Sequence, residues 1–175
     1  MSNKTLAIIA CTLLGLLLIR NEIRMDRMEE KLDDIVQTKY AVKYSPKDVE
    51  CLTKNIYYEA GIEPKAGKYA VAHVTVNRLQ SGYWGKDLCT VVYAKSQFSW
   101  TSIKSLPKPN KELWDESRSI AINVLEGARI RGLNKSLYYH ADYIKKPNWA
   151  DPTGYALTIG RHLFYNHAKD SRVYI

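Results

Sequence analysis

The stretch "NIYYEAGIEPKAGKYAVAHVTVNRL", residues 55–79, places Glu59 directly after two tyrosines and just before a turn of small residues. The sequence upstream predicts a helix over residues 46–60. Ser45 is a favoured N-cap, a proline follows at the first helical position, and Gly61 is a typical helix end. We therefore expect Glu59 in the last turn of a helix.

Within this helix, Glu59 shares a face with residues that are typical of a protein core. At helical spacing that face contains Cys51, Leu52, Asn55 and Ile56. A carboxyl group on such a face loses contact with water, and this loss raises its pKa. A carboxyl group that keeps its proton near neutral pH can serve as a general acid.

Two more helices are predicted downstream. One begins at Pro64 and ends at Gly82, and its His73 is expected to be a packing residue. The other follows the N-cap Asn110 and covers residues 111–128. Short aromatic segments, "TVVYAKSQFSW", "SLYYHADYI" and "YALTIGRHLFY", indicate strands or groove-lining loops. The pattern predicts an α+β domain that is mainly helical with short strands.

The N-terminus predicts an export signal. Residues 5–19, "TLAIIACTLLGLLLI", carry no charge, and this length fits the core of a secretory signal better than a full membrane span. No small-x-small cleavage pattern follows, so we expect an uncleaved signal anchor over residues 1–19 that holds the chain at the inner membrane. Topology stays open, because most of the nearby positive charges follow the apolar run.

Residues 20–44 predict a charged helical stalk and linker. Apolar residues recur at heptad spacing around it: Leu18, Met25, Met28, Leu32 and Ile35. Fewer than three clean heptads fit a dimer seam and a monomeric helix equally well, so the oligomeric state stays open. The folded domain is expected over residues 45–175.

The composition is that of a globular protein, with 46% hydrophobic and 25% charged residues in a chain of 175. This length excludes two large domains. The 13 tyrosines and 4 tryptophans suit a groove that stacks on sugars or bases. The net charge of +8 lies in residues 51–175 and favours an anionic partner. Because no nucleic-acid-binding signature is recognisable, we predict no nucleic acid partner.

Four blocks of the domain together resemble the SleB/CwlJ family of cell wall hydrolases. They are "IYYEAGIEPKAGKYAVAHVTVNR", "DLCTVVYAKSQFSW", "SLYYHADYIKKPNWA" and "TIGRHLFYNH", in the family's order. The resemblance implies a lysozyme-like α+β fold, peptidoglycan glycan strands as substrate and Glu59 as catalytic acid. A short exported chain with one catalytic domain also resembles a phage endolysin, which implies a role in cell lysis. The family's "EARGE" reads "EAGIE" here, so its arginine is missing.

The resemblance further implies a lytic transglycosylase, which cleaves the MurNAc–GlcNAc bond with a single acid and without a cofactor. Its catalytic domain would lie in the periplasm or the cell wall space. The candidates for polar contacts to the sugar are Gln97, Ser99 and His140, and those for stacking walls are Tyr57, Tyr139 and Trp149.

Three alternatives stay open. A hydrolytic muramidase needs a second carboxyl group, for which Glu63, Asp142 and Asp151 are candidates. Glu63 falls beyond the predicted helix end and fits better as a cap or ion-pair partner. A zinc amidase needs a ligand cluster, but the four histidines form no H-E-x-x-H motif, so no metal is predicted. A membrane-tethered glycan-binding module would tolerate neutralisation of Glu59.

Cys51 and Cys89 are predicted to form a disulfide, because an exported domain meets an oxidising compartment. Closing a loop of this length is worth about 3 to 4 kcal/mol in the chain-entropy account. Two buried free thiols are the alternative, and Cys11 is expected to remain in the anchor.

Overall fold

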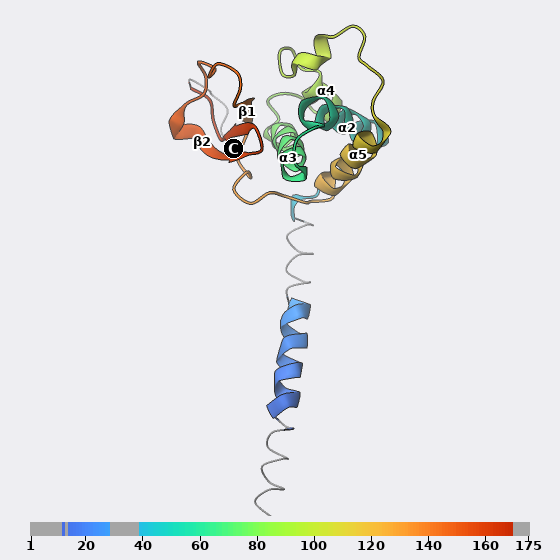
Figure 1. The fold of residues 1–175 in the computed structure, drawn as a ribbon, viewed down its shortest axis with the longest axis vertical. Helices are drawn as coiled ribbons and strands as arrows, with labels where there is room; N and C mark the ends of the chain where they lie inside the picture. Colours follow the sequence, from blue (N-terminus) through green and yellow to red (C-terminus); the bar gives the residue numbers. More distant parts are fainter. Residues whose placement is uncertain (1–11, 13, 29–38, 170–175) are drawn as a thin grey trace, which may run out of the picture. The chain divides into compact units, whose positions relative to one another are not determined.

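The computed structural model describes residues 12, 14–28 and 39–169, and the chain divides into two units, Met1–Lys39 and Tyr40–Ile175 (Figure 1). In the first unit, residues 14–28 are helical. Within the described ranges, no helix combines the length and the apolar character needed to cross a bilayer. Most of the predicted anchor and residues 29–38 of the predicted stalk lie outside the described residues.

The second unit begins with helices whose ends follow the sequence signals. Its α-helices are α2 (Pro46–Ala60), α3 (Lys65–Ser81), α4 (Leu88–Val92) and α5 (Lys111–Leu125), with short 3₁₀ helices η1 (Ser99–Ser102) and η2 (Pro152–Gly154). At the start of α2, the Ser45 hydroxyl accepts from the Asp48 N–H, and the Asp48 carboxylate accepts from the Ser45 N–H. This reciprocal pair is a capping box. α3 ends at Gly82, whose φ of 70° favours glycine.

The helices α2, α3 and α5 surround the main apolar core. Its buried members are Val49, Leu52, Ile56, Ala72, Val76, Leu88, Ile120, Ala121, Val124 and Leu125. His73 on α3 is 1% exposed, and its Nδ1 accepts from the Ile130 N–H at 3.3 Å. Burial lowers the pKa of His73 to about 3, so the ring is neutral. The prediction of a packing histidine is confirmed.

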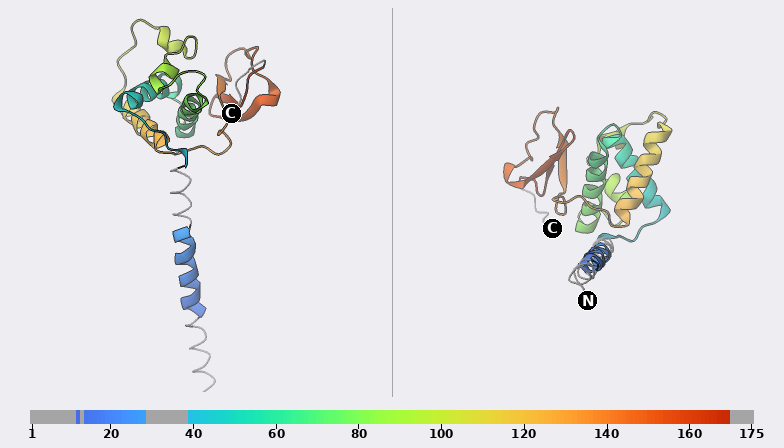
Figure 2. Two further views of the ribbon diagram at one scale, coloured as in Figure 1. Left: turned by 180° about the vertical axis from the view of Figure 1, so that it is seen from behind. Right: turned by 60° about the horizontal axis from the view of Figure 1, so that its bottom comes forward.

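A small antiparallel sheet lies beside the helices, with α3 nearest to it (Figures 1 and 2). Its strands are β1 (Tyr138–Ala141), β2 (Tyr155–Ile159) and β3 (His162–Tyr165), in the order β1-β3-β2. Phe164, paired with Tyr139 across the sheet, packs with Ala70 and Val74 of α3 in a second core. This mixture of helices with a small sheet matches the predicted fold class.

The segment "TVVYAKSQFSW", for which the sequence left a strand or a groove-lining loop open, contains no strand. Asp87 accepts from the Thr90 N–H at 2.8 Å and caps α4, so residues 88–92 are helical. After α4 the chain forms a loop and then η1. Residues 90–92 therefore fit neither alternative, because the local cap starts a helix there, whereas residues 93–98 form the loop that the second alternative predicted.

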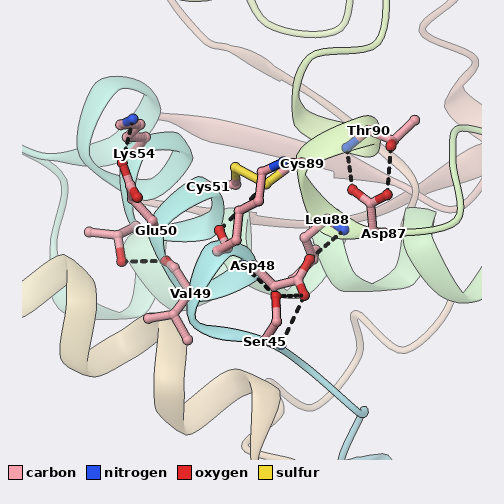
Figure 3. Close-up of a disulfide and its surroundings, with 12 residues drawn as sticks. Ser45, Asp48, Val49, Glu50, Cys51, Lys54, Asp87, Leu88, Cys89 and Thr90 are labelled. Carbon is pink, nitrogen blue, oxygen red and sulfur yellow. Dashed lines mark hydrogen bonds and ion pairs between the residues drawn. A yellow bond between two sulfur atoms is a disulfide. The ribbon is translucent and has the colours of Figure 1, made fainter.

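A disulfide joins Cys51 of α2 to Cys89 of α4, with a Cα–Cα distance of 5.2 Å (Figure 3). Beside it, the Asp48 carboxylate also accepts from the Leu88 N–H at 3.0 Å. The predicted pairing is confirmed. The two contacts fix α4 against the first half of the helix that carries Glu59.

Candidate active site

Glu59 lies in the last turn of α2 and is partly buried. Its Oε2 accepts a hydrogen bond from the Tyr139 hydroxyl at 2.9 Å. Because Tyr139 belongs to β1, this bond joins the helical part of the domain to the sheet. The two residues are far apart in the sequence, so only the fold brings them together.

Burial raises the pKa of Glu59, and the Tyr139 hydrogen bond and the charge of Arg78 lower it in part. The position on the helix acts in the same direction as burial, because the C-terminal end of a helix disfavours negative charge and no basic residue stands in the last turn of α2. Burial and the neighbouring Glu59 raise the pKa of Tyr139 well above its usual value, so the phenol remains a donor. Glu59 is thus suited to hold a proton and release it.

Glu59 opens into a cavity of about 490 Å³, which we call the first cavity. Its other lining residues come from α2, the segment 96–102, β1, the following loop and β3: Tyr58, Ser96, Gln97, Phe98, Ser99, Ser102, Tyr139, His140, Ala141, Tyr143, Ile144, Pro147, Trp149 and His162. Among these described residues, Glu59 is the single carboxyl group. Of the predicted sugar contacts, the structure brings five here: Gln97, Ser99, Tyr139, His140 and Trp149.

These five residues differ in how many hydrogen bonds and ring contacts they already make within the domain. His140 is buried, with Nδ1 2.9 Å from the Ala141 carbonyl and Nε2 3.2 Å from the Tyr165 hydroxyl. Trp149 packs edge-on against the His140 ring. By contrast, the Gln97 amide and the Ser99 hydroxyl have no hydrogen-bond partner among residues 39–169. Their polar groups are available to a ligand.

Tyr57 does not line the first cavity. Its hydroxyl accepts from the Asn110 N–H at 2.9 Å, and its ring packs on Trp114, so it ties α2 to the start of α5. Tyr57 instead lines a second cavity of about 420 Å³. Glu59, Tyr58 and Tyr143 line both cavities, so the carboxyl group stands where the two meet.

The candidates for a second acid occupy three different environments. Glu63 lies in the turn after α2, lines the second cavity, and accepts from the Arg161 N–H at 2.9 Å. Gly160 permits this approach, because a Cβ at that position would collide with the Glu63 carboxylate. Asp142 forms an exposed ion pair with Arg161 at 3.1 Å. Asp151 caps η2 by accepting from a backbone N–H at 2.9 Å.

Several residues that line the first cavity were not among the sequence candidates, Tyr58 and His162 among them. Tyr58 stacks on Trp100, with ring centroids 5.0 Å apart. His162 is 5% exposed and packs edge-on against Tyr139 at 5.2 Å. Arg78 lines neither cavity but belongs to a recess that shares a wall with the first cavity, described below. Helical spacing could not separate Tyr58 from Tyr57, because neighbouring residues flank the same face and only the position of β1 decides between them.

The described residues contain one group of three potential metal ligands, Asp48, Asp87 and Cys89. Cys89 is in the disulfide, and both aspartates cap helices. No histidine belongs to this group. The arrangement therefore gives the zinc amidase alternative no support.

Comparison with known proteins finds a matching family and a similar enzyme. The pattern of the cell wall hydrolase family matches residues 62–165. A spore cortex-lytic enzyme from Oceanobacillus iheyensis is 27% identical over 122 residues, which make up 69% of this chain and 42% of that protein. The chain thus spans less than half the length of this relative.

Two solved structures share the fold. The catalytic domain of the Bacillus cereus SleB protein has a TM-score of 0.58 at 23% identity, over 73% of this chain and 96% of that one. The catalytic domain of the germination-specific lytic transglycosylase SleB from Bacillus anthracis has a TM-score of 0.57 at 23% identity, over 70% and 96%.

The family match covers more than half of the chain, and its start lies just after Glu59. It spans α3, α4, α5 and the sheet, so the elements that surround Glu59 are those of the family. The chain belongs to the SleB/CwlJ family of cell wall hydrolases.

Proposed function

We propose that the protein is a peptidoglycan glycosidase that works as a lytic transglycosylase, with Glu59 as its single acid and base. One observation carries the proposal: Glu59 is the one carboxyl group in the lining of the first cavity and stands where both cavities meet. A glycan strand that ran through both cavities would place one of its glycosidic bonds at this carboxyl group.

The reaction needs only this one group. Glu59 donates its proton to the oxygen of the MurNAc–GlcNAc bond, and the bond from C1 of MurNAc to that oxygen breaks. The 6-hydroxyl oxygen of the same MurNAc bonds to C1, and its proton passes to the Glu59 carboxylate. The products are a 1,6-anhydro-MurNAc end and a free GlcNAc hydroxyl, with no water consumed and Glu59 again protonated.

Glu63 is the reason to keep a hydrolytic muramidase as the second candidate, since it lines the second cavity together with Glu59. That reaction needs a second carboxylate roughly 5 to 9.5 Å from the acid, to attack C1 or to activate a water. Against it, the Glu63 carboxylate already accepts from the Arg161 N–H.

The products distinguish these reactions. Purified peptidoglycan would be digested with the full chain, and the soluble fragments would be identified by mass spectrometry. Anhydro-muramyl ends are expected. Reducing ends without anhydro products would show a muramidase, and freed stem peptides would show an amidase. The Glu59→Gln protein serves as the control and should release none of them.

The cellular setting is also part of the proposal. Residues 5–19 would export the chain and hold it at the inner membrane, with the catalytic domain in the cell wall space, and a phage-type lysis role would follow from that placement. Deleting residues 1–19 should leave an enzyme that degrades isolated wall but does not lyse the producing cell. Lysis by the shortened form without a helper pore would refute this part.

A further inference from the structure

A recess opens beside the first cavity and is built around a buried cation. We call it the Arg78 recess, with a volume of about 320 Å³ and a lining of Arg78, Trp84, Ser96, Gln97, Tyr138, Tyr139, Trp149 and Ala168. Ser96, Gln97, Tyr139 and Trp149 also line the first cavity, so the two spaces share a wall. A group attached to a sugar in the first cavity has this recess as its neighbour.

Arg78, near the end of α3, is only 5% exposed. Its Nε donates to the Leu137 carbonyl at 2.7 Å, and its guanidinium carbon lies 5.4 Å from the Trp84 ring centre and 5.2 Å from that of Phe98. Nη1 is buried and has no acceptor among the residues that the structure describes. A buried charge with an unsatisfied donor is costly until an acceptor of opposite charge reaches it.

No carboxylate in residues 39–169 forms an ion pair with Arg78. The charge of Glu59 is close enough to interact with it, but that carboxyl group is hydrogen-bonded to Tyr139. If Glu59 is protonated when the enzyme is ready to react, as the proposed function requires, Glu59 supplies no negative charge at that moment. The guanidinium then lacks a counter-charge in the state that meets the substrate.

We propose that the Arg78 recess binds a carboxylate carried on the lactyl side of muramic acid, and thereby selects MurNAc over GlcNAc at the cleavage site. The inference rests on the proposed function. Two groups of peptidoglycan have this chemistry: the lactyl carboxylate itself, where the glycan has lost its peptide, and the carboxylates of the stem peptide. The Gln97 amide adds a donor beside the guanidinium, and Trp84 and Trp149 form apolar walls.

Binding to defined ligands tests the proposal. The full chain carrying Glu59→Gln binds without cleaving, and its dissociation constants would be measured by calorimetry. The ligands are chitotetraose, a GlcNAc–MurNAc tetrasaccharide with free lactyl carboxylates, the methyl ester of that tetrasaccharide, and the tetrasaccharide bearing stem peptides. We expect at least one carboxylate ligand to bind about tenfold or more tightly than chitotetraose, as a charged hydrogen bond allows.

The ligand series separates the two sources. The lactyl carboxylate is the group bound if the free-lactyl tetrasaccharide binds tightly and its methyl ester does not. The stem peptide supplies it if only the peptide-bearing ligand binds tightly. Chitotetraose that binds as tightly as both carboxylate ligands would overturn the inference while leaving the proposed function intact. Failure to bind any of the four saccharides would refute the proposed function itself.

Variants locate the effect in the recess. Arg78→Gln should reduce the affinity for the carboxylate ligand to that for chitotetraose. An equal loss for both ligands would indicate a neutral N-acetyl contact and overturn the inference.

Because Arg78 is buried, its variant is paired with Trp84→Ala, which alters a recess wall that the first cavity lacks. The matched control is the adjacent Tyr83→Ala, a residue that is 69% exposed and lines neither space, and that controls for its own edge-on contact with Trp84 at 5.1 Å. Trp84→Ala should weaken carboxylate binding, and an effect from Tyr83→Ala of the same size would also overturn the inference.

Discussion

The helical and sheet parts of the domain contribute different things to the site. The helical part, α2 to α5, has a disulfide, a capping box and a ten-residue buried core, and it carries Glu59. The sheet has strands of only 4, 5 and 4 residues, and it supplies Tyr139, His140 and His162. Glu59 is therefore placed by the more heavily cross-linked part, and the sheet supplies one wall of the cavity into which it opens.

Two hydrogen bonds join the end of α2 and the turn after it to the sheet side near the site. One runs from Tyr139 to Glu59, and the other from the Arg161 N–H to Glu63. The first acts on the acid directly, whereas the second holds the turn between β2 and β3 against the end of α2. The comparison therefore predicts that changes at Glu59 affect chemistry, changes at the disulfide affect stability, and changes at the joining contacts have smaller effects.

The largest effect is expected for Glu59→Gln. The amide keeps the size of the side chain but cannot donate the proton, so the rate on peptidoglycan should fall by roughly 10² to 10⁴. Release of soluble fragments measures it, with circular dichroism to check the fold. The matched control is Glu50→Gln on the same helix, which removes an exposed ion pair with Lys54 and should leave the rate unchanged. Near-normal activity of Glu59→Gln would refute the assignment.

The same variant makes a prediction about stability. Folding raises the pKa of Glu59 above its value in the unfolded chain. The contribution of Glu59 to the free energy of unfolding is therefore fully present below the unfolded pKa, and it is lost as the pH rises through the folded pKa. Glu59→Gln should therefore be more stable than the unsubstituted protein at neutral pH, and the difference should shrink toward acid pH. Urea unfolding at several pH values measures this, and a pH-independent difference would contradict it.

The next largest effect is a loss of stability when the disulfide of the helical part is removed. Replacing both Cys51 and Cys89 by serine opens a loop with a sequence separation of 38 and should lower the free energy of unfolding by about 4 kcal/mol. Activity at low temperature should persist, because Glu59 lies two turns beyond Cys51 on the same helix. Chemical denaturation of the oxidised, reduced and substituted proteins measures the difference. A loss below about 1 kcal/mol would mean that the core and caps hold α4 without the bond.

Tyr139→Phe should give a smaller change, visible in the pH profile. The hydrogen bond from Tyr139 lowers the pKa of Glu59, so its removal should raise that pKa further. Activity requires the protonated acid, and the alkaline limb of the profile should therefore move to higher pH. The control is Tyr138→Phe on the same strand, which should leave the limb in place. A shift to lower pH would contradict the sign of this argument.

The smallest effect is expected for Glu63→Gln, which keeps an acceptor for the Arg161 N–H. Under the transglycosylase proposal, the rate should fall less than about tenfold, because the residue holds a turn and takes no part in proton transfer. Asp142→Asn and Asp151→Asn should likewise lower the rate by less than about tenfold. A loss at Glu63 comparable with that at Glu59 would instead favour the two-carboxylate muramidase.

The helical part was largely predictable, since its signals are local. Ser45, Gly61 and Gly82 mark helix ends, and helical spacing put Glu59 on the inner face of α2. The sheet side was not predictable in the same way. The contact between Glu59 and Tyr139 joins residues 80 positions apart, and no local pattern encodes such a pairing.

Two further residues show what periodicity cannot supply. Arg78 belongs to a helix that is buried over much of its length, so its pattern gave no sign that a charge faces a recess. Tyr57 and Tyr58 are adjacent, and only the positions of α5 and β1 assign one to the second cavity alone and the other to both. The family resemblance implied Glu59 as a candidate acid, but it did not say which neighbouring ring lines the first cavity.

The disulfide has a topological consequence. It closes the chain from Cys51 to Cys89 into a covalent ring that contains all of α3 and the turn leading to α4. A protease that cut this turn at the exposed Lys86 would produce a nicked chain whose two pieces stay bonded. Glu59 on the first piece and Tyr139 on the second would remain in one molecule until a reductant opened the ring. A single cut in this segment would therefore not separate Glu59 from the sheet residues of its candidate site.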